Sequence, residues 1–204
     1  TTFCPPKAIR NKTNRMALID TYKQFPDYLW LHIYRRRIPL LVNEMRIKPR
    51  IKVLFILHCL DKWKTEGLYR LMLRHERFEP TLGLAMSLQE YPTAAVQKFQ
   101  LLKSHMEAQG YDYVELCQKD DITRLQPDII FYMEPYNGVI NRGLEYRNAP
   151  RSLFCFSTYG IHTVCYPWTA STICDKFLWQ DYYESDLAAQ DTLKLCPSRK
   201  NSLK

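Results

Sequence analysis

The spacing of apolar and polar residues along the chain changes near residue 51. From there on, short and nearly continuous apolar runs alternate with segments in which apolar residues recur every three or four positions. A continuous apolar run is typical of a strand covered on both faces, whereas the wider spacing is typical of an amphipathic helix. The runs predict six strands, over residues 52–57, 80–86, 113–116, 129–133, 153–156 and 176–179.

Three helices are predicted between these strands. Asp61 or Thr65 can cap the first helix, whose apolar residues are Leu68, Leu71 and Met72. The second helix is predicted to begin at Pro92 and to end at Gly110. Its apolar stripe consists of Val96, Phe99, Leu102 and Met106. A third, short helix is predicted just before the fourth strand, over residues 121–125.

Strands that alternate with helices favour an α/β fold. We predict a Rossmann-like, mostly parallel sheet over residues 51–185, with helices on both faces. Residues 1–50 are predicted to form a helical, basic and amphipathic arm in front of this domain. Residues 186–204 are predicted to form a tail or the start of a crossover into another domain.

The positive charge of the chain is concentrated in the arm. Residues 1–52 hold 12 Lys or Arg and 3 Asp or Glu, a balance of +9, and the remaining residues balance at −1. A nucleic-acid-binding domain usually carries a basic face on its body, so no nucleic-acid partner is expected. Pro26, Pro39 and Pro49 are expected to divide the arm into short helices.

Trp30 precedes three consecutive arginines, Arg35, Arg36 and Arg37, and this combination permits two interpretations. In the first, the ring lies at headgroup depth and the arginines meet the anionic surface of a membrane. In the second, the arm packs on its own domain and the arginines are solvated. No apolar stretch reaches the roughly 18 residues expected of a membrane span.

The 7 cysteines include no C-x-x-C pair, and no Cys and His residues cluster as metal ligands would. The odd count and the apolar surroundings of Cys59 and Cys155 indicate reduced thiols in a cytosolic protein. We therefore expect neither a metal site nor a cofactor. The first residues also lack the charged and then apolar pattern of a secretory signal peptide.

Ligands of parallel sheets bind beyond the carboxyl ends of the strands, which directs attention first to the loop after residue 57. His58 is a candidate acid or base there, and Asp61, Lys62, Trp63 and Lys64 are candidates for binding substrate. The loop has neither G-x-G-x-x-G nor G-x-x-x-x-G-K-[ST], so no dinucleotide or P-loop site is predicted. The alternatives are a structural histidine, a tryptophan packed beneath the loop and solvated lysines.

Two further loops follow the fourth and fifth predicted strands. Glu134 could accept a proton from an attacking hydroxyl, and Tyr136 lies beside it in a loop that also carries an Asn-Gly turn signal. After the fifth strand, Tyr159 and His162 flank Gly160, where the backbone can approach a ligand closely. His162 is a second candidate base.

Several segments carry a resemblance to known proteins: residues 52–58, 63–64, 68–72, 77–80, 127–132, 135–136 and 159–160. Together they resemble the bacterial CDP-glycerol glycerophosphotransferase-like proteins, a group related to teichoic-acid polymerases and to GT-B glycosyltransferases. The resemblance extends over roughly residues 50–185. It implies the N-terminal, acceptor-side domain of a GT-B transferase.

The resemblance also implies an activity and partners. The activity would be transfer of glycerophosphate or a sugar from a nucleotide-activated donor, CDP-glycerol or a nucleotide sugar, to a cell-envelope polymer or a lipid-linked acceptor. Peripheral association with the cytoplasmic face of the plasma membrane would suit that work. The group places its proposed base in a His-Gly motif, whereas this chain has Tyr159 before Gly160.

A second domain of about 150 residues normally binds the donor in this group, so the resemblance implies a half-enzyme that is inactive alone. A non-catalytic, membrane-recruited binding or partner domain of the same fold remains the alternative.

Overall fold

Six parallel strands form one sheet in the order β3-β2-β1-β4-β5-β6. The computed structural model describes residues 29–30, 32–118, 121–134, 138–157 and 177–180. The strands are β1 (Ile51–Leu57), β2 (Phe78–Leu84), β3 (Tyr113–Glu115), β4 (Ile129–Tyr132), β5 (Leu153–Ser157) and β6 (Phe177–Gln180). All six predicted strands are confirmed, and the all-parallel order is that of a Rossmann-like α/β fold.

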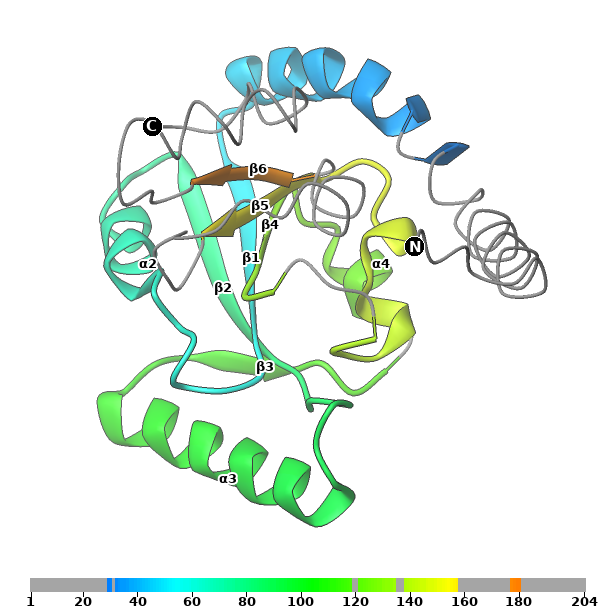
Figure 1. The fold of residues 1–204 in the computed structure, drawn as a ribbon. Helices are drawn as coiled ribbons and strands as arrows, with labels where there is room; N and C mark the ends of the chain where they lie inside the picture. Colours follow the sequence, from blue (N-terminus) through cyan, green and yellow to red (C-terminus); the bar gives the residue numbers. More distant parts are fainter. Residues whose placement is uncertain (1–28, 31, 119–120, 135–137, 158–176, 181–204) are drawn as a thin grey trace, which may run out of the picture.

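Helices cover both faces of the sheet (Figure 1). They are α2 (Glu66–Leu73), α3 (Pro92–Gln109) and α4 (Asp121–Leu125). Two short 3-10 helices, η1 (Arg142–Leu144) and η2 (Tyr146–Asn148), lie between β4 and β5. Tyr69 of α2 packs edge-on against Phe55 of β1, which stacks on Phe131 of β4. The opposite face of the sheet carries Phe154 of β5, where an N-terminal helix packs. The predicted fold class is therefore confirmed.

Two of the predicted apolar stripes are wrong in detail. In α2 the buried residue is Tyr69, whereas Leu68 and Leu71 are exposed, because this short helix meets the sheet only along one line. In α3 the core residue near the start is Ala95 and not Val96. The end of α3 agrees with the prediction, since Gly110 adopts a left-handed φ of 68°.

Residues 29–30 and 32–47 are helical and form what we call the N-terminal helix, drawn in blue in Figure 1. The prediction that Pro39 divides this segment is wrong, since residues 32–47 form one helix. Pro39 lies on the exposed side of the helix, where its ring meets solvent, while Leu41 on the other side is buried.

The inner face of the N-terminal helix belongs to the core of the domain. Trp30 stacks on Tyr34 with a ring separation of 4.8 Å and contacts Tyr146 edge-on at 4.6 Å. The Tyr34 hydroxyl donates to the carbonyl of Ser152 at 2.9 Å and accepts from the N–H of Phe154 at 3.2 Å. For the described part of the arm, the interpretation as a helix packed on its own domain is therefore confirmed.

Candidate functional site

The strand order places a topological switch point between β1 and β4. After β1 the chain moves outward to β2 and β3, and it then returns to place β4 on the other side of β1. In open α/β sheets, ligands bind beyond the carboxyl ends of the strands at such a point. The residues that directly follow β1 and β4 are therefore the first candidates for a functional site.

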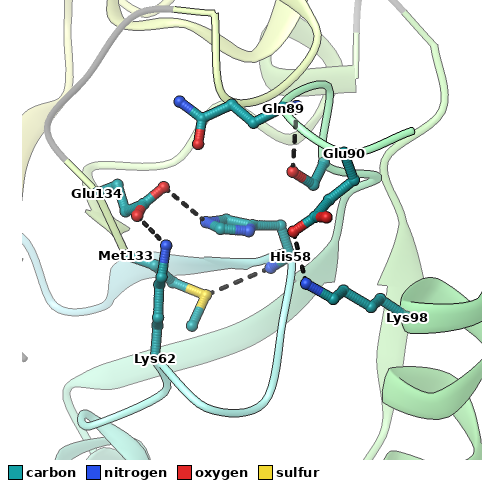
Figure 2. A network of polar contacts seen from close by, with 8 residues as sticks. His58, Lys62, Gln89, Glu90, Lys98, Met133 and Glu134 are labelled. Carbon is teal, nitrogen blue, oxygen red and sulfur yellow. Dashed lines mark hydrogen bonds and ion pairs between the residues drawn. The ribbon is translucent and has the colours of Figure 1, made fainter. Parts of the chain in front are cut away.

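His58 and Glu134, candidates from the loops after two different predicted strands, meet at this switch point (Figure 2). His58 Nε2 lies 3.6 Å from Glu134 Oε2, and both side chains are almost fully buried, at 6% and 5% exposed. The backbone N–H of His58 donates to Met133 Sδ at 3.3 Å, which fixes the start of the loop against the end of β4.

Lys62 completes the cluster from the same loop as His58. Its ammonium group forms an ion pair and hydrogen bond with Glu134 Oε1, while about a third of the side chain stays in solvent. Glu134 therefore has a cation on one oxygen and an imidazole facing the other. This arrangement holds the buried carboxylate in one orientation.

The electrostatics of the site favour a neutral imidazole. Burial lowers the pKa of His58, because a charged ring would lose its hydration, while the negative charge of Glu134 raises that pKa and Lys62 lowers it. The effect of burial is the largest of the three. A neutral histidine has one nitrogen free to accept a proton, which is the state that a general base requires.

Buried polar atoms without a hydrogen-bond partner also mark this end of the sheet. Among the described residues they are His58 Nε2, Glu134 Oε2 and Trp63 Nε1. The first two face each other at a distance slightly beyond hydrogen-bond range. Because catalytic hydrogen bonds in unliganded sites are often long and shorten on substrate binding, this gap is compatible with a working pair.

The loop after β2 adds groups that the sequence analysis missed. Glu90 pairs with Lys98 of α3 at 2.5 Å, and both charges are close enough to influence His58 (Figure 2). The N–H of Leu88 donates to the carbonyl of Val139 at 2.7 Å, which ties this loop to the segment after β4. The carboxyl-edge rule applies to this loop as well, because Leu88 and Glu90 follow the strand whether it ends at Met86, as predicted, or at Leu84, as observed.

The other candidate residues of the loop after β1 lie in two different environments. Asp61 and Lys64 are exposed beside the cluster. Trp63 is buried against Tyr69 and Tyr111, at ring separations of 6.3 and 5.7 Å. Trp63 therefore packs beneath the loop, which was the alternative interpretation, and its ring face is not open to a sugar.

Four predicted site residues, Tyr136, Tyr159, Gly160 and His162, lie outside the described residues. Trp30, one of the predicted membrane-binding residues, packs into the aromatic cluster of the core, whereas Arg35 and Arg36 are exposed and Arg37 is half-exposed.

The turn from β1 into α2 does not fit a phosphate group. It contains no glycine that would let the backbone approach a phosphate, and Trp63 fills the space beneath it. Glu66 places a carboxylate in the first turn of α2, where the helix dipole would otherwise favour an anion. These features distinguish the turn from the nucleotide-binding turns of dinucleotide-binding Rossmann domains.

A cavity of about 310 Å³ lies at the opposite, amino edge of the sheet. Lys48 and Asp128 line it and form an ion pair at 2.5 Å, with Asp128 also accepting from the N–H of Lys52. These contacts hold the entry of β1 to the entry of β4. The cavity lies away from His58 and Glu134.

The arrangement can hold a neutral imidazole beside a fixed carboxylate, which is the combination that general acid and base chemistry uses. Within the described parts of the chain, no group of three or more His, Cys, Asp or Glu residues is placed to hold a metal ion. None of the described helices is long and apolar enough to cross a membrane. No family model, no curated protein and no solved structure matches this chain.

Proposed function

We propose that this domain is the acceptor-side half of a transferase, in which His58 and Glu134 act together on an acceptor hydroxyl. The observation that carries the proposal is the pair itself. A buried imidazole faces a buried carboxylate at 3.6 Å across the switch point of the sheet. A buried histidine whose pKa is shifted by burial and by a neighbouring carboxylate is more common at functional sites than elsewhere.

In the proposed reaction, the oxygen of the acceptor hydroxyl attacks the donor while neutral His58 accepts the hydroxyl proton. The new bond forms at the phosphorus of the glycerophosphate or at the anomeric carbon of the sugar, and the bond from that atom to the nucleotide breaks, so that the nucleotide leaves. With its proton on Nε2 directed at Glu134, the ring has Nδ1 free as the acceptor nitrogen. The charge that develops on the ring is then stabilised by Glu134 Oε2, which accepts no hydrogen bond from any described residue. Lys62 holds Glu134 in place through its other oxygen. Base catalysis of this kind contributes about 10²- to 10⁴-fold to a rate.

The substrates follow from the resemblance to CDP-glycerol glycerophosphotransferase-like proteins. The donor is a nucleotide-activated glycerophosphate or sugar, and the acceptor is a cell-envelope polymer or lipid-linked molecule at the cytoplasmic face of the plasma membrane. A glycine-free first turn with Glu66 in the following helix supports assigning the nucleotide to another domain.

A second candidate is a non-catalytic binding or partner domain of the same fold. The ion pair of Lys62 with Glu134 favours it, because this pair already neutralises the buried carboxylate without any substrate. In that case the cluster stabilises the loop and performs no proton transfer.

The test begins with binding. The chain is titrated with glycerol phosphate oligomers as acceptor mimics, and with CDP, CDP-glycerol and UDP-sugars, while the imidazole signal of His58 is followed by NMR. We expect the oligomers to shift this signal and the nucleotides to leave it unchanged. Micromolar binding of a nucleotide to this chain would contradict the assignment to the acceptor side.

A transfer assay separates the two candidates. Labelled CDP-glycerol is supplied with membranes that provide the acceptor and a donor-binding partner. His58→Gln and Glu134→Gln are expected to lower turnover at least tenfold while leaving the melting temperature within a few degrees. His75→Gln, at an exposed histidine that contacts Phe78 edge-on, is the matched control. Equal turnover in all three variants would favour the non-catalytic domain.

A further inference from the structure

The N-terminal helix has a second apolar face that no described residue covers. Leu29, Ile33, Leu40 and Ile47 are 53%, 52%, 61% and 85% exposed. At about 100° per residue, these four positions fall within an arc of about 40°. We call this line of side chains the outer ridge. Its centre lies about 120–140° around the helix from Tyr34 and Met45, which face the core.

Basic residues flank the outer ridge. Arg36 and Arg37 lie on its two sides by helical spacing, and Arg46 follows near the end of the helix. Glu44, the one acidic residue among positions 32–47, is exposed at the edge of the ridge on the side of Arg37. An apolar line with arginines on both sides and little negative charge is the composition of a helix that lies in a membrane interface.

The charge also argues against a second copy of the chain as the occupant. Two outer ridges packed face to face would bring the same arginines close together, and like charges across an interface oppose association. An anionic surface, by contrast, complements them. The helix is about 28 Å long at 1.5 Å per residue. Because one of its faces packs against the core, it can meet an anionic surface only with its axis parallel to that surface.

We propose that the outer ridge and its arginines seat the protein on an anionic lipid bilayer, with the N-terminal helix parallel to the membrane plane. The apolar side chains enter the headgroup region, and Arg36 and Arg37 meet lipid phosphates. From the sequence, Trp30 was expected to lie at headgroup depth, whereas this proposal leaves Trp30 in the core and uses a neighbouring face of the same helix, about 60–100° away from it.

Co-sedimentation of the full chain with vesicles tests the proposal. We expect binding to phosphatidylcholine mixed with phosphatidylglycerol, weak binding to phosphatidylcholine alone, and a loss of binding as salt is raised. The pair Arg36→Glu and Arg37→Glu is expected to weaken binding to mixed vesicles on the order of tenfold or more. The pair Ile33→Gln and Leu40→Gln is expected to act in the same direction.

Matched controls make the same types of substitution at exposed residues outside the N-terminal helix. Leu71 and Leu101, at 65% and 63% exposed on α2 and α3, are replaced by Gln in one control. Arg74 and Arg151, both exposed, are replaced by Glu in the other. Both controls are expected to bind as the unmodified chain does.

Three outcomes would overturn the proposal. One is the absence of binding to mixed vesicles by the unmodified chain, which needs no variant to interpret. Another is equal loss in the ridge variants and their controls. The third is a dimer in solution that Ile33→Gln with Leu40→Gln converts to a monomer, because the ridge would then be an interface between copies. Circular dichroism of every variant checks that the helix is retained.

Discussion

At the scale of single residues, the surroundings of His58 shift its pKa away from the ordinary value of a histidine. Burial lowers its pKa, and Glu134 offsets only part of that effect. A group whose folded-state pKa is depressed in this way binds its proton more readily in the unfolded chain than in the folded protein. Protonation therefore works against the fold.

This difference predicts a dependence of stability on pH. The unfolded chain takes up a proton on His58 near the ordinary pKa of about 6.5, whereas the folded protein resists it. We expect the free energy of unfolding to fall as the pH falls below about 6.5, with a contribution from His58 of at most about 1.4 kcal/mol per pH unit. Urea denaturation between pH 7 and pH 5 measures it, and His58→Gln should flatten the curve.

Glu134→Gln gives the matched comparison. Removing the negative charge that raises the pKa of His58 and that pairs with Lys62 should depress that pKa further. The loss of stability in acid then becomes steeper than in the unmodified chain over the pH range in which His58 titrates. If His58→Gln and Glu134→Gln both show the same dependence of stability on pH as the unmodified chain, His58 is not the titrating group.

Glycine at position 83 is required by space and not by backbone conformation. A Cβ atom built there would lie 2.6 Å from Leu116 Cδ1 and 3.0 Å from Leu54 Cδ1. Gly83→Ala is expected to reduce the free energy of unfolding by about 1–3 kcal/mol through overpacking. Gly67→Ala, in α2 with nothing within 4 Å of the new atom, should instead raise it by up to about 1 kcal/mol. Urea melts of the two variants check the opposite signs.

The sequence could predict part of the site at this scale. His58 and Glu134 follow strands, and the rule that ligands bind at carboxyl ends selects them without coordinates. Lys62 as the partner of Glu134 could not be predicted in the same way, because the contact depends on how one loop folds back over its neighbour. The packing of Trp63 against Tyr111 depends likewise on a contact between loops distant in sequence.

At the scale of elements, strands were easier to predict than the faces of helices. A strand buried on both sides is a run of apolar residues wherever it lies, and all six were found. A helix face depends on which side meets the sheet, and for α2 that side is set by Tyr69 packing on Phe55. Apolar residues at helical spacing therefore identified the helix correctly and its buried face incorrectly.

The N-terminal helix is held to the sheet by a hydrogen-bonded tyrosine. Tyr34 is 2% exposed and its hydroxyl serves both the carbonyl of Ser152 and the N–H of Phe154. Tyr34→Phe leaves both buried groups without this partner, which is expected to cost about 1–3 kcal/mol of unfolding free energy. Tyr91→Phe, at an 85% exposed tyrosine, is the control and should change nothing measurable. A stable Tyr34→Phe variant would show that water replaces the hydroxyl.

At the scale of the whole molecule, the strand order makes β1 the best-supported strand. It pairs with β2 over seven residues and with β4 over four, whereas β3 lies at an edge and pairs over three. We expect hydrogen exchange of the backbone amides to be slowest in β1 and much faster in β3. Mass spectrometry of peptic peptides measures this ordering. Equal protection of the two strands would indicate a sheet that opens only as a unit.

The contact of Tyr34 with Phe154 has a consequence for the newly made chain. The two residues are 120 positions apart, so at about 5–20 residues per second the helix is synthesised roughly 6–24 s before β5 exists to receive it. Throughout that interval both its inner aromatic face and its outer ridge are uncovered. The nascent protein therefore presents to chaperones, or to a bilayer, a helix that is apolar on two sides, and completion of β5 covers the inner one.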